Sequence, residues 1–269
     1  MQVPLHLILL CASDSRMTAV HHGGTWKELT AWLPMQPGLQ RVVCDIYGTL
    51  LHVESGPSAP EAAWKKAWQR CVPTAPFIEW DQMHQQLLTA VQAEHAQSAR
   101  FHEVDWVKIF HTLGGNARLA RHHARLQRHC QLMPGAAEFI RHSKLPLALC
   151  SNSQAYTLME MRLALRAAGL KLSRFDLQNS FLSYRHLTAK PNPAIWQLLE
   201  QKFAPTPPSA FLMIGDRSDN DIEPALKAGW STWLLSSMAT SAERSQYKPH
   251  RGRAANGAVE AGNVGEDEG

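Results

Sequence analysis

Apolar residues follow two different periods along the chain, and the change of period separates two kinds of structure. Residues 39–45 form an apolar, β-branched run closed by Asp45, which is typical of a buried parallel strand. From about residue 57 to residue 134, apolar side chains recur every three or four positions, so the pattern predicts an all-helical insert. The periodic positions are Trp64, Ala67, Trp68, Cys71, Met83, Leu87, Leu88, Val91, Val104, Val107, Ile109 and Phe110.

After Pro134 and Gly135 the pattern alternates between short apolar runs and longer helical periods. Such alternation predicts an α/β fold, in which a parallel sheet carries helices on both faces. Two of the predicted helices are followed by Gly169 and Gly229, which are common helix stops. The predicted strands are residues 145–150, 180–182, 211–214 and 232–235, and the predicted helices are residues 156–168, 194–202 and 221–228.

These patterns divide the chain into segments. The α/β core is expected in residues 39–53 and 134–240, and the helical insert in residues 54–133. Residues 1–38 are expected to be an extension, because they combine an apolar run and two prolines with only a short helical pattern around Trp26 and Leu29; Met17 is an alternative start. Residues 241–269 are rich in glycine, alanine and charge, which predicts a disordered tail.

The composition is that of a globular protein, with 45% hydrophobic and 19% charged residues. The net charge of +4 indicates a slightly basic surface, which suits a small anionic partner and does not indicate nucleic acid. Five cysteines without a C-x-x-C pair indicate neither a disulfide framework nor a zinc site, so a reducing cytoplasm fits best. Residues 5–12 are apolar but lack a basic start, and no stretch has the ~20 apolar residues of a membrane helix. We therefore expect a soluble cytoplasmic protein that does not act at a membrane.

Polar residues close or follow four of the predicted strands. Asp45 ends the first, Ser151 and Asn152 end the second, Lys190 follows the third, and Asp216 ends the fourth. Ligands of open parallel sheets bind beyond the carboxyl ends of the strands, so these side chains are expected to meet. One such residue alone would indicate only a turn, but four in order predict an active site.

These segments resemble the motifs of the haloacid dehalogenase superfamily, and the resemblance covers residues 39–236. The matching motifs are Asp45-Ile46-Tyr47-Gly48-Thr49, Ser151, Lys190 and Gly215-Asp216-Arg217-Ser218-Asp219-Asn220-Asp221. The resemblance implies a hydrolase with a Rossmann-like core and a helical cap inserted after the first strand. It also implies that Asp45 is the nucleophile and forms a covalent aspartyl intermediate, which divides one difficult displacement into two easier ones.

The same resemblance gives roles to the other strand ends. It implies that Ser151 hydrogen-bonds the bound anion and that Lys190 neutralises charge among the carboxylates and the substrate. Thr49 in the first motif and Asn152 beside Ser151 are further candidate catalytic residues.

The fourth motif would bring several carboxylates close to Asp45, where they would repel one another unless a cation lay between them. Mg²⁺ is the natural choice, because it prefers oxygen ligands and retains water. We expect Asp45, the backbone carbonyl of Tyr47 and Asp216 to bind it directly. Asp221 would help through water or by its position, or would stabilise a helix N-terminus, which is the role expected for Asp219.

The first motif departs from that of the superfamily's phosphatases, which place a second Asp two residues after the nucleophile to protonate the leaving oxygen. Here that position is Tyr47, an arrangement that looks like that of the 2-haloacid dehalogenases. Those enzymes work without metal and place an Arg from the cap on the halide; Arg70 lies in the insert. Either Tyr47 donates a proton through its phenol, or the leaving group departs without much help.

We weight the acidic fourth motif more heavily, because a cluster of carboxylates has few uses other than binding a cation. The leading prediction is a Mg²⁺-dependent hydrolase, a phosphatase acting on a small phosphorylated metabolite. The alternatives are a metal-independent 2-haloacid dehalogenase and a catalytically weak ligand-binding or scaffold protein on the same fold.

Two further patterns in the insert each allow a structural and a functional interpretation. A basic helix is predicted over residues 118–129, and it is either a solvated face or a surface that attracts an anionic substrate. Four tryptophans either form the core of the insert or line a substrate pocket. They are Trp64, Trp68, Trp80 and Trp106.

Overall fold

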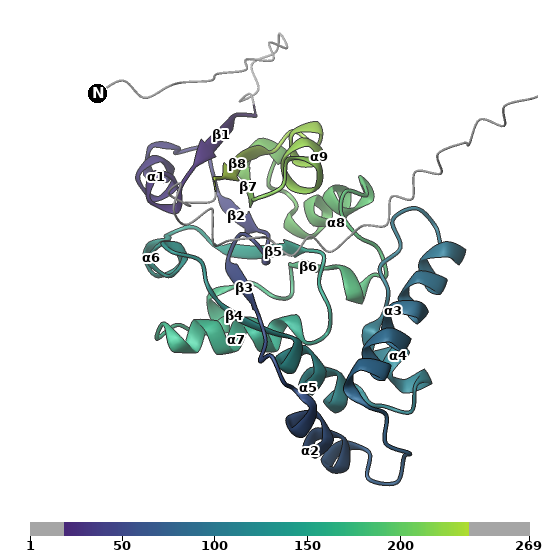
Figure 1. The fold of residues 1–269 in the computed structure, drawn as a ribbon. Coiled ribbons are helices and arrows are strands. Elements are labelled where there is room, and N and C mark those ends of the chain that lie inside the picture. Colours follow the sequence, from purple (N-terminus) through teal and green to yellow (C-terminus); the bar gives the residue numbers. More distant parts are fainter. Residues whose placement is uncertain (1–18, 237–269) are drawn as a thin grey trace, which may run out of the picture. The chain divides into compact units, whose positions relative to one another are not determined.

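A six-stranded sheet lies at the centre of the chain (Figure 1). The computed structural model describes residues 19–236. The strand order is β1-β8-β7-β2-β5-β6, and every neighbouring pair in it is parallel. The strands are β1 His21–Gly24, β2 Arg41–Cys44, β5 Leu147–Ser151, β6 Phe181–Leu182, β7 Phe211–Gly215 and β8 Ser231–Leu235. The predicted α/β fold with a parallel sheet is therefore confirmed.

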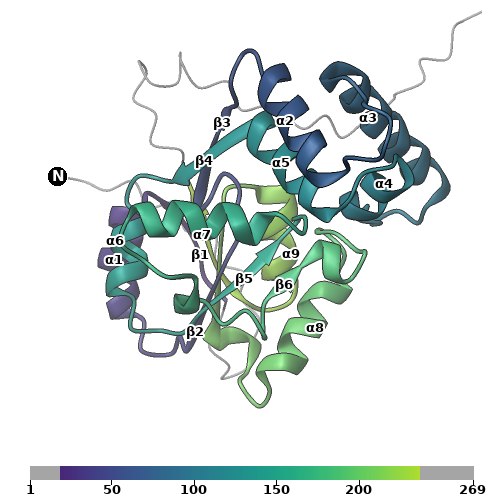
Figure 2. The same ribbon diagram turned by 90° about the horizontal axis from the view of Figure 1, so that it is seen from below.

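Helices cover both faces of this sheet (Figure 2). Helices α1 (Trp26–Trp32), α6 (Ala136–His142) and α7 (Thr157–Ala167) lie on one face, and α8 (Ala194–Phe203) and α9 (Glu223–Lys227) on the other. Successive side chains of a strand point to opposite faces, so Val42 packs into one buried cluster and Val43 into the second. The central strands are continuous apolar runs because both faces of the sheet are buried under helices.

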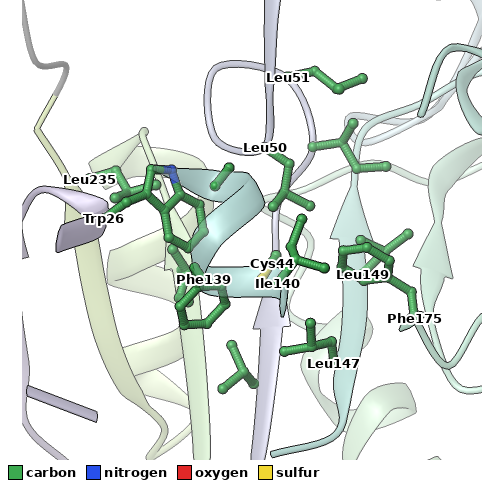
Figure 3. Close-up of a cluster of buried hydrophobic side chains, with 14 of the residues drawn as sticks. Trp26, Cys44, Leu50, Leu51, Phe139, Ile140, Leu147, Leu149, Phe175 and Leu235 are labelled. Atoms are coloured by element: carbon green, nitrogen blue, oxygen red, sulfur yellow. The ribbon is translucent and has the colours of Figure 1, made fainter. Parts of the chain in front are cut away.

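The first cluster includes residues from the segment that was expected to be an extension. Trp26 of α1 packs against Phe139 of α6 with ring centroids 4.7 Å apart (Figure 3). Strand β1 pairs with β8 in the register His21↔Thr232, and Thr25 caps α1 together with Glu28. From His21 onward this segment is part of the core, and the prediction of an extension is wrong there.

Some expectations concern residues that the structure does not describe. The disordered tail from residue 241, the apolar stretch 5–12, and Met17 as a start all lie outside residues 19–236. Within residues 19–236, none of the helices combines the length and the hydropathy that a membrane crossing requires.

The helical insert folds around a cluster of its own, and we call residues 61–127 the cap. Its helices are α2 (Glu61–Cys71), α3 (Trp80–Gln97), α4 (Trp106–Thr112) and α5 (Ala117–Gln127). Trp64 and Trp68 are buried in the cluster, and Trp80 and Trp106 pack against it half-buried, which fits the expectation that they form the core of the insert.

A two-stranded antiparallel ribbon joins the cap to the core (Figure 1). It consists of β3 (Leu51–Ser55) and β4 (Arg128–Leu132), and Ser55 pairs with Arg128 at the end next to the cap. The predicted basic helix over residues 118–129 is therefore too long. It ends at Gln127, because Arg128 and His129 pair with β3 instead of continuing the helix.

Candidate active site

The ends of strands β2 and β7 bring three carboxylates together. Asp45 follows β2, Asp216 follows β7, and Asp221 lies in the π-helical turn Ser218–Ile222 that leads into α9. Each offers a carboxylate oxygen within 4.8 Å of those of the other two. Residues that are far apart in the sequence thus form one cluster at the carboxyl edge of the sheet, where ligands of such sheets bind.

Lys190 lies between two of these carboxylates and is almost fully buried. Its Nζ is 2.8 Å from Asp45 Oδ1, 2.5 Å from Asp221 Oδ1 and 2.8 Å from the carbonyl oxygen of Cys150, so all three ammonium hydrogens have acceptors. Burial alone would lower the pKa of Lys190, but attraction by Asp221 and Asp45 outweighs it and raises the pKa. Lys190 is therefore a permanent positive charge at the centre of the cluster.

Asp216 and Asp221 lie in different surroundings. Loss of solvation and the nearby charge of Asp45 raise the pKa of Asp216 to about 6, although its own backbone N–H and the hydroxyl of Thr49, at 3.2 Å, donate to its carboxylate. Asp221 is fully buried, which raises its pKa, and both of its oxygens are engaged: Lys190 donates to Oδ1 and the Arg217 N–H to Oδ2, at 3.2 Å. Asp216 keeps oxygen lone pairs for a cation, whereas Asp221 is held in place by protein donors.

Two glycines allow the carboxylates to come this close. Gly48 has a φ of +81°, and a Cβ at this position would collide with the carboxylate of Asp216. A Cβ on Gly215 would collide with the side chain of Asp221. The first and fourth motifs therefore need glycine where the backbone of one segment meets a carboxylate.

Ser151 and Asn152 differ in what they can reach. The Ser151 hydroxyl is buried, and its only recorded partner within residues 19–236 is the Asn152 carbonyl at 3.4 Å, so it can turn toward a bound anion. The Asn152 amide instead bonds the backbone of Lys190 in both directions, at 2.7 Å to its N–H and 3.1 Å to its carbonyl. Asn152 thus positions Lys190.

The Tyr47 hydroxyl contacts residues outside the four sequence motifs. Its oxygen lies 2.5 Å from Glu160 Oε2, 2.8 Å from Thr157 Oγ1 and 2.8 Å from Arg128 Nη2. Arg128 also binds both oxygens of Glu160 at 2.9 Å, and burial raises the pKa of the phenol well above its ordinary value. The one phenolic hydrogen is held by Glu160, so Tyr47 has no free hydrogen for a leaving group.

One sequence signal could have pointed to this network. Glu160 lies on the apolar side of its predicted helix, next to Met161 and one turn before Ala164, and all three residues are buried. A carboxylate on a buried helix face requires a partner, because an unpaired buried charge is costly. The identity of the partner depends on the ribbon, which the apolar pattern did not reveal. Arg70, the candidate halide ligand, is exposed on α2.

Comparisons with known proteins indicate a family for this chain. A family model for haloacid dehalogenase-like hydrolases matches residues 39–229. A search of curated proteins finds no significant match. Among solved structures, a HAD phosphatase from Thermococcus onnurineus is 20% identical, with 75% of this chain and 88% of that chain covered and a TM-score of 0.45. A HAD family enzyme from Bacteroides thetaiotaomicron in complex with magnesium is 16% identical, with 78% and 100% covered and a TM-score of 0.47.

Proposed function

The chain belongs to the haloacid dehalogenase-like hydrolase family, and we propose that it is a Mg²⁺-dependent phosphatase that cleaves a small phosphorylated metabolite through an aspartyl-phosphate intermediate. One observation carries the proposal. The carboxylates of Asp45, Asp216 and Asp221 converge within 4.8 Å, although Lys190 supplies a single positive charge among them. A divalent cation would balance the remaining negative charge.

The donor set of this cluster fits Mg²⁺, which takes oxygen ligands and keeps several waters. Asp45 and Asp216 would bind it directly together with the Tyr47 carbonyl. Asp221 would act by position, since its two oxygens already accept hydrogen bonds from Lys190 and Arg217. Once bound, the ion would offset the negative charge of the phosphate and so let a carboxylate approach it.

Gly48→Ala is expected to weaken Mg²⁺ binding about 10-fold or more, because the new Cβ would displace the carboxylate of Asp216. Gly114→Ala is a matched control: Gly114 has a φ of +79°, against +81° for Gly48, but apart from its two chain neighbours no residue in the described range 19–236 comes within 4 Å of its Cβ position. Both variants should share the backbone strain of about 1–2 kcal/mol. Calorimetric Mg²⁺ titration would separate the two effects, and equal affinities in the two variants would contradict the proposed ligand role of Asp216.

Asp45 is arranged to attack phosphorus. Its Oδ1 accepts a hydrogen bond from Lys190 and keeps a second lone pair for the cation, which leaves Oδ2 to form the bond to phosphorus while the bond to the leaving oxygen breaks. Ser151 would donate to a non-bridging phosphate oxygen, and Lys190 would stabilise the developing negative charge. Water then attacks the phosphorus of the aspartyl phosphate, which releases inorganic phosphate and restores the Asp45 carboxylate.

The surroundings of Tyr47 bear on the substrate class. With its hydrogen on Glu160, Tyr47 cannot protonate the leaving oxygen, and a general acid is worth typically ~10²–10⁴ in rate. The substrates best served are phosphates whose leaving group is already a weak base, such as acyl or aryl phosphates.

The rate should therefore depend steeply on the leaving group. Across a series of aryl phosphates, kcat/KM is expected to fall strongly as the pKa of the leaving phenol rises, and simple alkyl phosphates should be about 10²-fold or more poorer substrates than the best aryl phosphate. Phosphate release measured over such a series would test this. A flat dependence, with alkyl phosphates cleaved as fast as aryl ones, would show that an acid is present after all.

A second candidate function is 2-haloacid dehalogenation, which the Asp-x-Tyr-Gly-Thr arrangement at residues 45–49 favours. In that reaction Asp45 would displace halide to form an ester that water hydrolyses, with no proton needed by the leaving group. The acidic cluster argues against it, because Asp216 and Asp221 would repel a carboxylate substrate unless a cation covered them.

One experiment distinguishes these functions. The full chain is incubated with p-nitrophenyl phosphate and with 2-chloropropionate, each with Mg²⁺ and with EDTA. We expect phosphate release that EDTA abolishes and Mg²⁺ restores. Chloride release in EDTA would replace the proposal by dehalogenation. Absence of both, with thermal stabilisation by Mg²⁺ and inorganic phosphate, would indicate a ligand-binding protein.

A further inference from the structure

The cap contacts the core at a second place besides the ribbon, through the cap loop of residues 101–106. Backbone hydrogen bonds join this loop to the core segment 187–189: Ala189 donates to the carbonyl of Phe101 at 2.8 Å, and Glu103 to that of Leu187 at 3.3 Å. The Glu103 carboxylate accepts from Ser183 Oγ at 2.7 Å, on the core side. We call these contacts between the cap loop and the core the seam.

Gln154 extends the seam toward the active site. Its side-chain amide donates to Glu103 Oε1 at 2.8 Å and to the Val104 carbonyl at 2.9 Å, and its oxygen accepts from the Trp106 N–H at 3.2 Å. Three groups of the cap loop are thus bound by one buried side chain, which lies three residues after Ser151. The backbone N–H of Gln154 in turn donates to Thr157 Oγ1 at 2.9 Å.

Thr157 links Gln154 to Tyr47 through its hydroxyl. Its hydroxyl accepts from Gln154 and lies 2.8 Å from the Tyr47 oxygen. A phenol has one hydrogen, and the Glu160 carboxylate at 2.5 Å can only accept, so Thr157 is the donor to Tyr47. The Tyr47 oxygen also accepts from Arg128, whose guanidinium lies over the Tyr47 ring at 4.7 Å.

Arg128 completes the path, because it is the first residue of β4, where the ribbon meets the cap. A continuous chain of hydrogen bonds therefore runs from the cap loop through Gln154, Thr157 and Tyr47 to the ribbon. Nearly every member of it is buried or half-buried, so the bonds are shielded from competing water.

From this path we infer that Tyr47 is a positioning residue that holds the cap on the core. It joins the two places where the cap is attached, the seam and the ribbon, and it does so from the loop that carries the nucleophile Asp45. The residue two positions after the nucleophile thereby couples the position of the cap to the geometry of the attacking carboxylate. The coupling to catalysis rests on the proposed function, whereas the effect on the cap does not.

The test is Tyr47→Phe, which keeps the ring under Arg128 and removes only the hydroxyl. Hydrogen exchange of the Glu103 and Ala189 amides reports on the seam without any need for activity. We expect their exchange to become about 5-fold faster, the effect of losing one hydrogen bond, while the amides of Val43 and Leu149 in the central strands keep their rates. Tyr184→Phe is the matched control, because among the described residues only the Arg185 side chain hydrogen-bonds that hydroxyl.

Three outcomes would overturn the inference: unchanged exchange at the seam, the same acceleration in Tyr184→Phe, or an equal acceleration in the central strands. A double-mutant cycle with Thr157→Val gives a second readout, and strictly additive effects on seam exchange would also oppose it. With p-nitrophenyl phosphate we expect Tyr47→Phe to raise KM more than it lowers kcat. No turnover even in the unmodified protein would refute the phosphatase proposal and leave the exchange result standing.

Discussion

Asp45→Asn is expected to lower kcat for p-nitrophenyl phosphate by about 10³-fold or more, because the amide cannot form the covalent intermediate. The fold should persist. Asn has the size of Asp, its side-chain oxygen can still accept from Lys190, and Lys190 keeps its bonds to Asp221 and to the Cys150 carbonyl. The loss would then be one of chemistry, measured as initial rates of phosphate release at saturating Mg²⁺.

Asp219→Asn is the matched control for this result, since it makes the same chemical change within the fourth motif. Asp219 is 63% exposed, its ion pair within residues 19–236 is with Arg217, and such surface ion pairs contribute little. We expect its kcat to stay within about 3-fold of the unmodified protein. Comparable losses in both variants, or an Asp45→Asn protein that keeps full turnover, would show that Asp45 is not the nucleophile.

The parts of the fold that could be predicted are those whose buried side chains give a clear pattern of apolar residues in the sequence. Strands β2, β5 and β7 are buried on both faces, so they appear in the sequence as continuous apolar runs, and the polar residues that follow them stand out. Because parallel strands end at one edge of the sheet, the meeting of Asp45, Lys190 and Asp216 could be expected from their order alone.

The parts that could not be predicted depend on backbone pairing. Strand β1 has the sequence His-His-Gly-Gly, and it joins the sheet edge through main-chain hydrogen bonds that leave no apolar pattern. The ribbon strand β4 continues a helical pattern of basic residues, and only its pairing with β3 ends the helix at Gln127. Helix α6 is a short helix of seven residues, too short to show a clear period.

In the candidate site, too, some features could be predicted from the sequence and others could not. Which residue types stand at the strand ends could be read from the sequence, but the partners of Tyr47 and Asn152 could not. Tyr47 faces Arg128 and Glu160, which are 81 and 113 positions away, and Asn152 binds backbone atoms of Lys190. Such roles depend on where cap, ribbon and core meet, and no local sequence pattern encodes that.

Lys190→Met is expected to lower the free energy of unfolding by about 3–5 kcal/mol in the absence of Mg²⁺, because it removes one partner of a buried ion pair and leaves the other uncompensated. Lys190 and Asp221 are almost fully buried, and Met fills a similar volume, so the effect is electrostatic and not one of packing. Urea unfolding at neutral pH measures it. Lys202→Met is the matched control, since the Lys202 ammonium donates to two carbonyl groups and to no carboxylate in the described part of the chain, so its loss should cost about 1 kcal/mol.

The double variant Lys190→Met with Asp221→Asn decides whether the charge is the cause. Asp221→Asn removes the carboxylate that Lys190→Met leaves without a counter-charge. The two substitutions together should therefore lower the free energy of unfolding less than Lys190→Met alone. Lower pH should have the same effect on the single variant. Lys190 lowers the pKa of Asp221 against the effect of burial, so its loss raises that pKa further, and the stability deficit of Lys190→Met should shrink as pH falls below the folded pKa of Asp221 in the variant. If the losses of unfolding free energy from Lys190→Met and Asp221→Asn add in the double variant, and the loss from Lys190→Met does not change with pH, Lys190 contributes packing and not charge.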